Sequence, residues 1–210
     1  MVDLKPYLQD SASGTACVPS HYDSATELSA VFLRLLDFLP GELLCPVLDI
    51  GPGDGWMSLR LQERYSEVHA ITLFEDEARR CRENGVRSVT VGDMHDMPAE
   101  WSGVFGGLWA SHVLEHSPAP YVFLKECHRV MVPGGTLVLV APEPKGYVGL
   151  GNKHPFRCGD MTLHVFCASI DTVIEIARHA GLSFDGYHEV PQTCGGVNHY
   201  YHRVWVMSKP

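Results

Sequence analysis

Alternating glycines after a short apolar run form a turn whose residue types suit ligand binding. The run 47–50 is typical of a buried strand. It leads into glycines at three alternate positions, Gly51, Gly53 and Gly55. Glycine admits a positive φ and lets a ligand approach without an intervening Cβ. Asp49, within the run, would repel a phosphate but attract an ammonium or sulfonium group. The alternative is an ordinary tight turn.

A helix is predicted directly after this turn, over residues 56–65, because apolar residues recur there at helical spacing. The first N–H groups of a helix lack intrahelical partners, so they can face a ligand. Strand, glycine turn and helix in this order are typical of nucleotide binding. The spacing Gly-x-Gly-x-Gly nevertheless differs from the Gly-x-Gly-x-x-Gly of dinucleotide folds.

The remaining elements also alternate between strand and helix, which implies a mainly parallel sheet with helices on both faces. Ligands of such sheets bind outside the carboxyl ends of the strands, where the glycine turn falls. A further turn is predicted at 133–135. We predict helices over 25–39, 75–84, 121–130 and 170–180, and strands over 68–73, 86–91, 104–110, 136–141, 184–190 and 200–207.

The composition is that of a globular chain with an acidic balance. Of 210 residues, 45% are hydrophobic and 20% are charged, which suits one domain with a sizeable core. The formal net charge of −9 disfavours nucleic acid as a partner, because no basic excess neutralises phosphates. The basic cluster Arg79, Arg80 and Arg82 lies among acids and predicts a solvated helix face.

Cysteine usage and the N-terminal sequence predict a cytoplasmic protein with reduced thiols. The seven cysteines include no C-x-x-C pair, and the first ten residues carry charges and a proline rather than a signal peptide. No apolar run is long enough to cross a bilayer, so no membrane role is predicted. Zinc usually takes ligands at short, paired spacings, so no metal is predicted for the scattered set His154, Cys158, His164, Cys167 and Cys194.

Four motifs in order resemble those of the class I S-adenosylmethionine-dependent methyltransferases, in their small-molecule subgroup. They occupy 47–55, 91–94 (Val-Gly-Asp-Met), 110–116 (Ala-Ser-His-Val-Leu-Glu-His) and 127–137, and 164–167 resembles the segment before the family's last helix. The resemblance spans residues 20–208. It implies an α/β fold with a Rossmann-like, doubly wound, mainly parallel sheet and an antiparallel C-terminal strand. It also implies a single domain over 1–210, with 1–40 as an N-terminal lid and helix.

The resemblance implies a position for each part of S-adenosylmethionine. The glycine turn passes under the methionine part, which Asp49 orients, and Ser111 and His112 border the same part. Asp93 accepts a hydrogen bond from the adenine amino group, and the N–H of Met94 donates to the ring.

One departure from the family concerns the ribose. The family carries an acid at the end of the second strand, where this chain has Thr72. A hydroxyl lacks the charge-assisted hydrogen bond of a carboxylate. Glu75, at the start of the next helix, is predicted to substitute for the missing acid.

Histidine is the predicted general base, because its unperturbed pKa lies near neutrality. The resemblance places His116 after the fourth strand and beside the sulfonium, and His154 and His199 are further candidates. The alternative for His116 is that it packs or caps its loop.

Substrate contacts are predicted from three segments outside these motifs. Tyr22 would lie on the N-terminal lid. Asn152 and Arg157 lie in a long loop after the fifth strand, and long loops at this end of a sheet are often binding loops. Tyr200 would project from the last strand. The alternatives are packing of Tyr22 on the first helix and a solvated surface loop.

The resemblance implies methyl transfer from S-adenosylmethionine to an O, N, S or C nucleophile of a small molecule. Two alternatives stay open. A cofactor-binding partner or regulatory subunit without catalysis would suit the missing ribose acid. An RNA or protein methyltransferase is disfavoured by the acidic balance and by the lack of an appended recognition domain.

Overall fold

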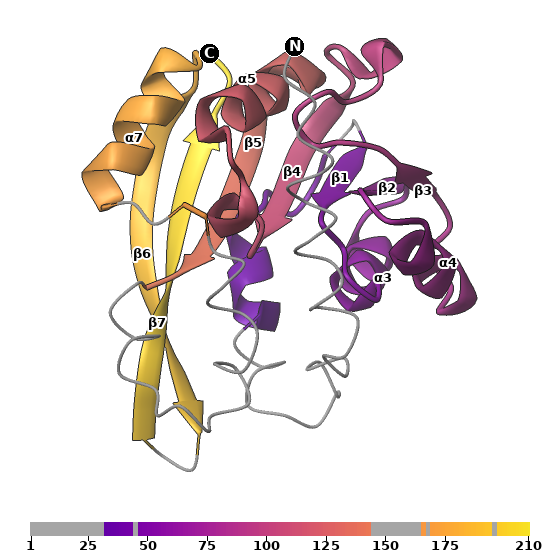
Figure 1. Cartoon of the computed structure of the whole chain (residues 1–210), viewed down its shortest axis with the longest axis horizontal. Coiled ribbons are helices and arrows are strands. Elements are labelled where there is room, and N and C mark those ends of the chain that lie inside the picture. The colour runs from indigo at the N-terminus through magenta and orange to yellow at the C-terminus, as the bar shows by residue number, and fades with distance from the viewer. Residues whose placement is uncertain (1–31, 44–45, 144–164, 167–168, 195–196) are drawn as a thin grey trace.

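The strands form one seven-stranded sheet in the order β3-β2-β1-β4-β5-β7-β6 (Figure 1). The computed structural model describes residues 32–43, 46–143, 165–166, 169–194 and 197–210, and of 192–194 and 197–200 the backbone alone. The five strands from β3 to β5 pair in parallel, and β7 runs antiparallel to both β5 and β6. The predicted doubly wound, mainly parallel sheet with an antiparallel C-terminal strand is confirmed.

The elements follow one another closely between residues 47 and 143. The strands are β1 (Val47–Ile50), β2 (Val68–Thr72), β3 (Val89–Val91), β4 (Phe105–Ser111), β5 (Met131–Pro142), β6 (Ser183–Cys194) and β7 (Val197–Ser208). The helices are α3 (Trp56–Arg64), α4 (Glu75–Glu83), α5 (Pro120–Val130) and α7 (Ile170–His179), with short 3-10 turns η1 (Leu36–Phe38), η2 (Ala99–Trp101) and η3 (Leu114–His116).

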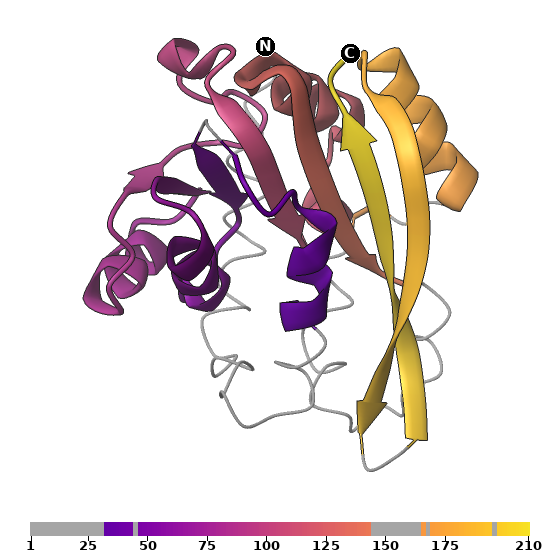
Figure 2. The same ribbon diagram turned by 180° about the vertical axis from the view of Figure 1, so that it is seen from behind.

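Helices cover both faces of the sheet. All residues of β1 and all but the last of β4 are buried, as expected for central parallel strands that lack a solvated face. Figure 1 shows α5 and α7 in front of the sheet, where they pack on Leu48, Leu108 and Leu139. Figure 2 shows the segment 32–38 in front of the opposite face. There it shares a core with α3 and with Trp109.

Two predicted boundaries are corrected by strand pairing. Residues 133–135, predicted as a turn, lie within β5, where the register with β4 shifts between the pairs Phe105–Met131 and Gly107–Thr136. The turn-forming residues make a bulge because the flanking residues still pair with β4. The strand predicted over 86–91 begins only at Val89, because Val86 packs under α4 instead.

The topology places a ligand-binding position beside β1. The chain passes from β1 outward to β2 and β3, and then returns across β1 to β4 on its other side. Strand order therefore reverses between β1 and β4. In open α/β sheets, ligands bind at such a switch point, outside the carboxyl ends of the strands. The glycine turn after β1 and the loop after β4 meet there.

Candidate active site

The glycine turn needs its glycines for two different reasons. Gly51, Gly53 and Gly55 have φ values of 71°, 57° and 86°. A Cβ on Gly51 would lie 2.2 Å from Val113 Cγ1, and one on Gly55 would lie 2.5 Å from Val86 Cγ2. No described atom lies within 4 Å of a Cβ built on Gly53. The first and third glycines therefore serve packing, whereas the second faces open space that a ligand can occupy.

Helix α4 holds this turn from the side. The Cys81 thiol donates to the Gly53 carbonyl at 3.0 Å, and burial raises the pKa of this thiol to about 12. Arg80 forms an ion pair with Asp54 at 2.7 Å, and the Asn84 amide donates to the Asp54 carbonyl at 2.9 Å. The prediction of a solvated face is therefore wrong for Arg80, because its guanidinium fixes the turn.

Asp49 is buried below the turn, with 1% of its surface exposed. The Ser58 hydroxyl donates to its carboxylate at 2.6 Å. Burial raises the pKa of Asp49 from 3.8 to about 7, although the Ser58 hydrogen bond opposes this rise. A cation bound above the turn would favour the ionised carboxylate, as predicted from the residue type.

A different acid from the predicted one lies at the end of β2. Thr72 is buried, and its hydroxyl donates to Glu77 Oε2 at 2.5 Å. Burial raises the pKa of Glu77, and the Thr72 hydrogen bond opposes that rise. Glu75 is exposed instead and forms an ion pair with Arg82 at 3.2 Å. Glu77 is therefore the carboxylate that contacts Thr72, whereas the predicted Glu75 lies at the exposed surface beside Arg82.

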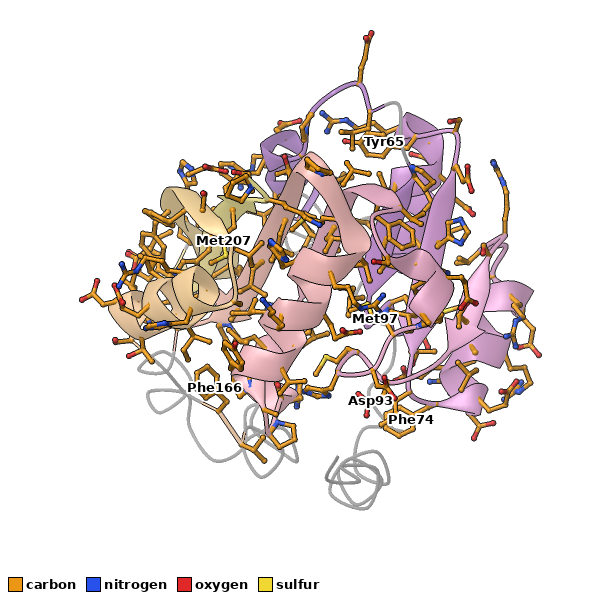
Figure 3. The ribbon with its side chains drawn as sticks, turned by 90° about the horizontal axis from the view of Figure 1, so that it is seen from above. Tyr65, Phe74, Asp93, Met97, Phe166 and Met207 are labelled. Atoms are coloured by element: carbon orange, nitrogen blue, oxygen red, sulfur yellow. The ribbon has the colours of Figure 1, made fainter. Side chains whose placement is uncertain are left out.

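Asp93 is oriented by a histidine that follows it. The N–H of His95 donates to Asp93 Oδ1 at 2.8 Å, and His95 Nδ1 lies 2.7 Å from the same oxygen. His95 Nε2 lies 2.8 Å from the buried Ser117 hydroxyl, which anchors the ring. Figure 3 shows the side chains of Asp93 and Phe74, after β3 and β2, on the same side of the ribbon. The Asp93 carboxylate thus has a fixed orientation.

The end of β4 combines an unpartnered hydroxyl with a strained histidine. Among the described residues, Ser111 Oγ is buried without a hydrogen-bond partner, so it can bind a ligand. His112 has a φ of 56°. It is the only non-glycine residue in the described ranges whose φ is positive. Its Nδ1 lies 3.1 Å from Glu115 Oε1, and its Nε2 lies 3.0 Å from His202 Nδ1.

Comparison with known proteins agrees with this arrangement. Residues 48–139 match the profile of the methyltransferase-domain family. This range, a little under half of the chain, therefore resembles a methyltransferase domain. The matched range spans the glycine turn, Asp93 and the loop after β4.

Curated relatives share only part of their length with this chain. The ubiquinone biosynthesis O-methyltransferase of Xanthomonas oryzae pv. oryzae is 33% identical over 98 residues, which are 44% of this chain and 41% of the relative. The malonyl-[acyl-carrier protein] O-methyltransferase of Dechloromonas aromatica is 26% identical over 166 residues, 79% of this chain and 62% of the relative. The chain thus spans under two thirds of the length of either relative.

A solved structure shares the fold of this chain. The S-adenosylmethionine-dependent methyltransferase of Mesorhizobium loti superposes with a TM-score of 0.69, covering 86% of this chain and 98% of that one. The two sequences are 16% identical, so the likeness concerns the fold alone. Function must be argued from the site.

The structure brings together the predicted cofactor residues but not all predicted catalytic ones. His116 is half-buried in η3. It remains a candidate base. Outside the described side chains lie the predicted residues Tyr22, Asn152, His154, Arg157, His199 and Tyr200.

Sequence reasoning missed four functional candidates, namely Glu77, His95, Glu115 and His202. Glu115 lies within the motif 110–116 and His95 directly follows the motif 91–94, so their positions were visible but their contacts were not. Glu77 lies five residues after Thr72 and in the first turn of α4. The connection from β2 into α4 therefore spans the distance between the two residues. His202 joins the site only through the pairing of β5 with β7, which places it beside Pro142. No short-range sequence signal carries that contact.

Two further findings concern the described residues alone. No helix in those ranges is long and apolar enough to cross a membrane. No group of three or more histidine, cysteine or acidic residues in those ranges has an arrangement that could hold a metal ion.

Gly53 offers a direct test of ligand binding at the turn. Gly53→Asn adds a side chain to open space, and asparagine tolerates a positive φ better than other side chains do. We expect a stability loss of about 1 kcal/mol or less, but roughly tenfold weaker binding of S-adenosyl-homocysteine by calorimetry. Gly103→Asn is the matched control, because its φ is 67° and no described atom lies within 4 Å of its Cβ position. Equal affinity in both variants would contradict a ligand at the turn.

Proposed function

We propose that this chain transfers the methyl group of S-adenosylmethionine to an oxygen of a small-molecule acceptor. The observation that carries the proposal is the convergence of the open position at Gly53, the oriented Asp93 and the unpartnered Ser111 hydroxyl. They follow three different strands and meet at the carboxyl edge of the sheet. Bound S-adenosylmethionine would supply an electrophilic methyl group on a sulfonium.

The residues present fit each part of this cofactor. Asp49 lies under the turn, and its ionisation would be favoured by the ammonium and sulfonium charges. Glu77, held by the Thr72 hydroxyl, offers a carboxylate for the ribose hydroxyls. Asp93 offers an acceptor for the adenine amino group. Charge-assisted hydrogen bonds of this kind are roughly twice as strong as neutral ones.

An oxygen acceptor is favoured by the relatives, both of which are named O-methyltransferases. A hydroxyl acceptor is consistent with histidines at the site, because a hydroxyl must lose its proton, whereas a carboxylate acceptor is already ionised near neutral pH and needs no base. The net charge of −9 favours a small molecule over RNA. A regulatory subunit without catalysis would bind the cofactor in the same way. Only a measurement of turnover therefore distinguishes such a subunit from an enzyme.

The test has two stages on the purified full chain. Calorimetry with S-adenosylmethionine and S-adenosyl-homocysteine should show saturable binding. Transfer of labelled methyl is then measured over panels of phenols, carboxylic acids, amines and thiols. The proposal expects transfer to phenols or carboxylates above amines and thiols. Binding without any transfer would support the regulatory alternative, and absence of binding would overturn the whole assignment.

The ribose assignment gives a prediction with an internal control. Glu77→Gln keeps the shape and the Thr72 contact but removes the charge. We expect S-adenosyl-homocysteine to bind about three- to tenfold more weakly, because a neutral acceptor makes weaker hydrogen bonds to hydroxyls. Glu75→Gln, on the same helical turn but exposed, should leave the affinity unchanged. A larger loss for Glu75→Gln than for Glu77→Gln in the same calorimetric titration would restore the original sequence prediction.

A further inference from the structure

One face of α4 is joined to the glycine turn by three hydrogen bonds. Arg80 Nε donates to Asp54 Oδ1 at 2.7 Å, and the Cys81 thiol donates to the Gly53 carbonyl at 3.0 Å. The Asn84 amide donates to the Asp54 carbonyl at 2.9 Å. Two successive carbonyls of the turn and the carboxylate between them are therefore all directed toward the same helix.

The Cys81 contact fixes the direction of the peptide between Gly53 and Asp54. Burial raises the pKa of Cys81 to about 12, so the thiol keeps its proton near neutral pH and remains a donor. In a trans peptide the C=O and the N–H point in opposite directions, and the described ranges contain no cis peptide. Because the Gly53 carbonyl points toward α4, the Asp54 N–H points away from it. Within the described part of the chain this N–H donates to no acceptor, whereas the Gly55 N–H donates to the Pro52 carbonyl at 2.9 Å.

The side of the turn away from α4 is the side on which strand order reverses. α4 packs on Ala70 of β2, which lies on one side of β1, whereas β4 lies on the other side (Figure 1). The loop after β4 reaches the turn where Val113 packs against Gly51. A donor directed away from α4 therefore points toward the switch point, where ligands of such sheets bind.

The charge beside this donor is neutralised from the opposite side. A backbone N–H suits an anionic oxygen, such as a carboxylate of a ligand. The Asp54 carboxylate belongs to the same residue as the donor and would repel such an anion. Arg80 opposes this repulsion, because its guanidinium pairs with that carboxylate at 2.7 Å and holds it toward α4. The side chains of Arg80 and Asp54 are 37% and 27% exposed, so salt screens the pair less than a fully exposed one.

We propose that the Asp54 N–H binds the carboxylate of the cofactor's methionine part, and that Arg80 is the positioning residue that makes this possible. The inference rests on the proposed binding of S-adenosylmethionine at the glycine turn. Arg80 touches no part of the cofactor and acts through Asp54, whose charge it neutralises and whose side chain it holds. The turn thereby selects ligands that carry the amino-acid carboxylate.

The first test compares two ligands by calorimetry on the purified full chain. They are S-adenosyl-homocysteine and its decarboxylated analogue, which keeps the ammonium but lacks the carboxylate. The wild type should bind S-adenosyl-homocysteine about tenfold more tightly than the analogue, because the analogue makes no charge-assisted hydrogen bond to the turn. Arg80→Gln should bind S-adenosyl-homocysteine about tenfold more weakly and the analogue within about threefold of wild type.

The control is a substitution of the neighbouring arginine. Arg79 forms ion pairs with Asp76 and Glu83 on the exposed surface of the same helix. Arg79→Gln should leave the affinity for both ligands unchanged. Equal losses for both ligands in Arg80→Gln would overturn the positioning role, because a displaced helix weakens contacts along the whole cofactor rather than at its carboxylate alone.

A second substitution separates the charge of Asp54 from the packing of α4. Asp54→Asn in the Arg80→Gln background removes the unpaired carboxylate and keeps both the N–H and the backbone carbonyl. The double variant should bind S-adenosyl-homocysteine within about threefold of wild type. Ion pairs near the surface contribute little to stability, so both variants should keep the unfolding midpoint of the wild type. A double variant that binds no more tightly than Arg80→Gln would overturn the role of the charge.

Hydrogen exchange measured by NMR tests the donor itself. In the free wild type, the Asp54 amide should exchange faster than the Gly55 amide, which is bonded within the turn. S-adenosyl-homocysteine should slow exchange at Asp54 by about tenfold or more, and the decarboxylated analogue should not. Equal exchange at Asp54 in the free protein and in the complex with S-adenosyl-homocysteine would overturn the assignment of this N–H.

The outcomes separate this inference from the proposed function. A wild type that binds S-adenosyl-homocysteine and its decarboxylated analogue equally tightly would overturn the carboxylate site and leave the turn as a cofactor site. Unchanged affinities in Arg80→Gln would likewise remove the role of Arg80 alone. A wild type that binds neither S-adenosylmethionine nor S-adenosyl-homocysteine would overturn the proposed function and this inference with it.

Discussion

At pH 8, an Asp49→Asn variant is expected to unfold at a higher denaturant concentration than the wild type and yet to bind S-adenosylmethionine more weakly. The wild-type carboxyl is buried under the glycine turn with a hydrogen bond from Ser58. An asparagine of the same shape keeps this contact without burying a charge. The gain should reach several kcal/mol, whereas the affinity should fall roughly tenfold, about 1.4 kcal/mol.

The sign of the effect follows from proton linkage. Asp49 has a pKa of about 7 in the folded chain, above the 3.8 of an unperturbed aspartate. Between these values the folded state holds a proton that the unfolded state has released, so stability falls as the pH rises. Above pH 7 the cost reaches a constant maximum of about 4 kcal/mol, at 1.36 kcal/mol per pKa unit. Asp49→Asn removes this cost, so its advantage should be small at pH 4 and largest above pH 7.

Urea unfolding of both proteins between pH 4 and 8 checks this prediction. Asp185→Asn is the matched control, because Asp185 also accepts from a serine hydroxyl, that of Ser208, but on the exposed surface. Its effect on stability should stay within about 0.5 kcal/mol at every pH. If Asp49→Asn were less stable than the wild type at pH 8, other interactions in the folded state would have to offset the cost of burying the carboxylate. The linkage argument would then fail.

Local sequence patterns predicted the fold and the position of the glycine turn because these depend on neighbours in the chain. The apolar run before Gly51 and the three alternate glycines specify strand, turn and helix without reference to distant residues. The order of alternating elements then specifies parallel pairing. The reversal of strand order beside β1 follows, and it places the turn at the carboxyl edge.

Contacts that cross between elements escaped prediction. The roles of Glu77 and Arg80 depend on how α4 packs against β2 and the turn, which fixes side-chain direction rather than helix position. The contact between His112 and His202 spans 90 residues and exists only because β7 inserts between β5 and β6. Amphipathic periodicity specifies which face of an element is buried, but it does not specify which polar residue that face meets.

An Asp93→Asn variant is expected to reverse the preference of the protein between two nearly identical ligands. The wild type should bind S-adenosyl-homocysteine more tightly than S-inosyl-homocysteine, in which a carbonyl oxygen replaces the amino group. A carboxylate accepts from an amino group but repels a carbonyl oxygen. In the variant, the inosyl ligand should bind at least as well as the adenosyl ligand.

The reversal is expected because His95 fixes the orientation of the side chain at position 93. The N–H of His95 donates to Asp93 Oδ1, so an amide there must turn its oxygen toward His95 and its NH₂ toward the base. That NH₂ faces the adenine amino group donor to donor, which is unfavourable, but it donates a hydrogen bond to the inosine oxygen. Each mismatch costs about 1–3 kcal/mol, so the ratio of the two affinities should change by roughly thirtyfold or more. Asp96→Asn, exposed three residues later, should leave the ratio unchanged in parallel calorimetric titrations. Equal losses for both ligands in Asp93→Asn would mean that this carboxylate supports the loop through His95 and does not read the base.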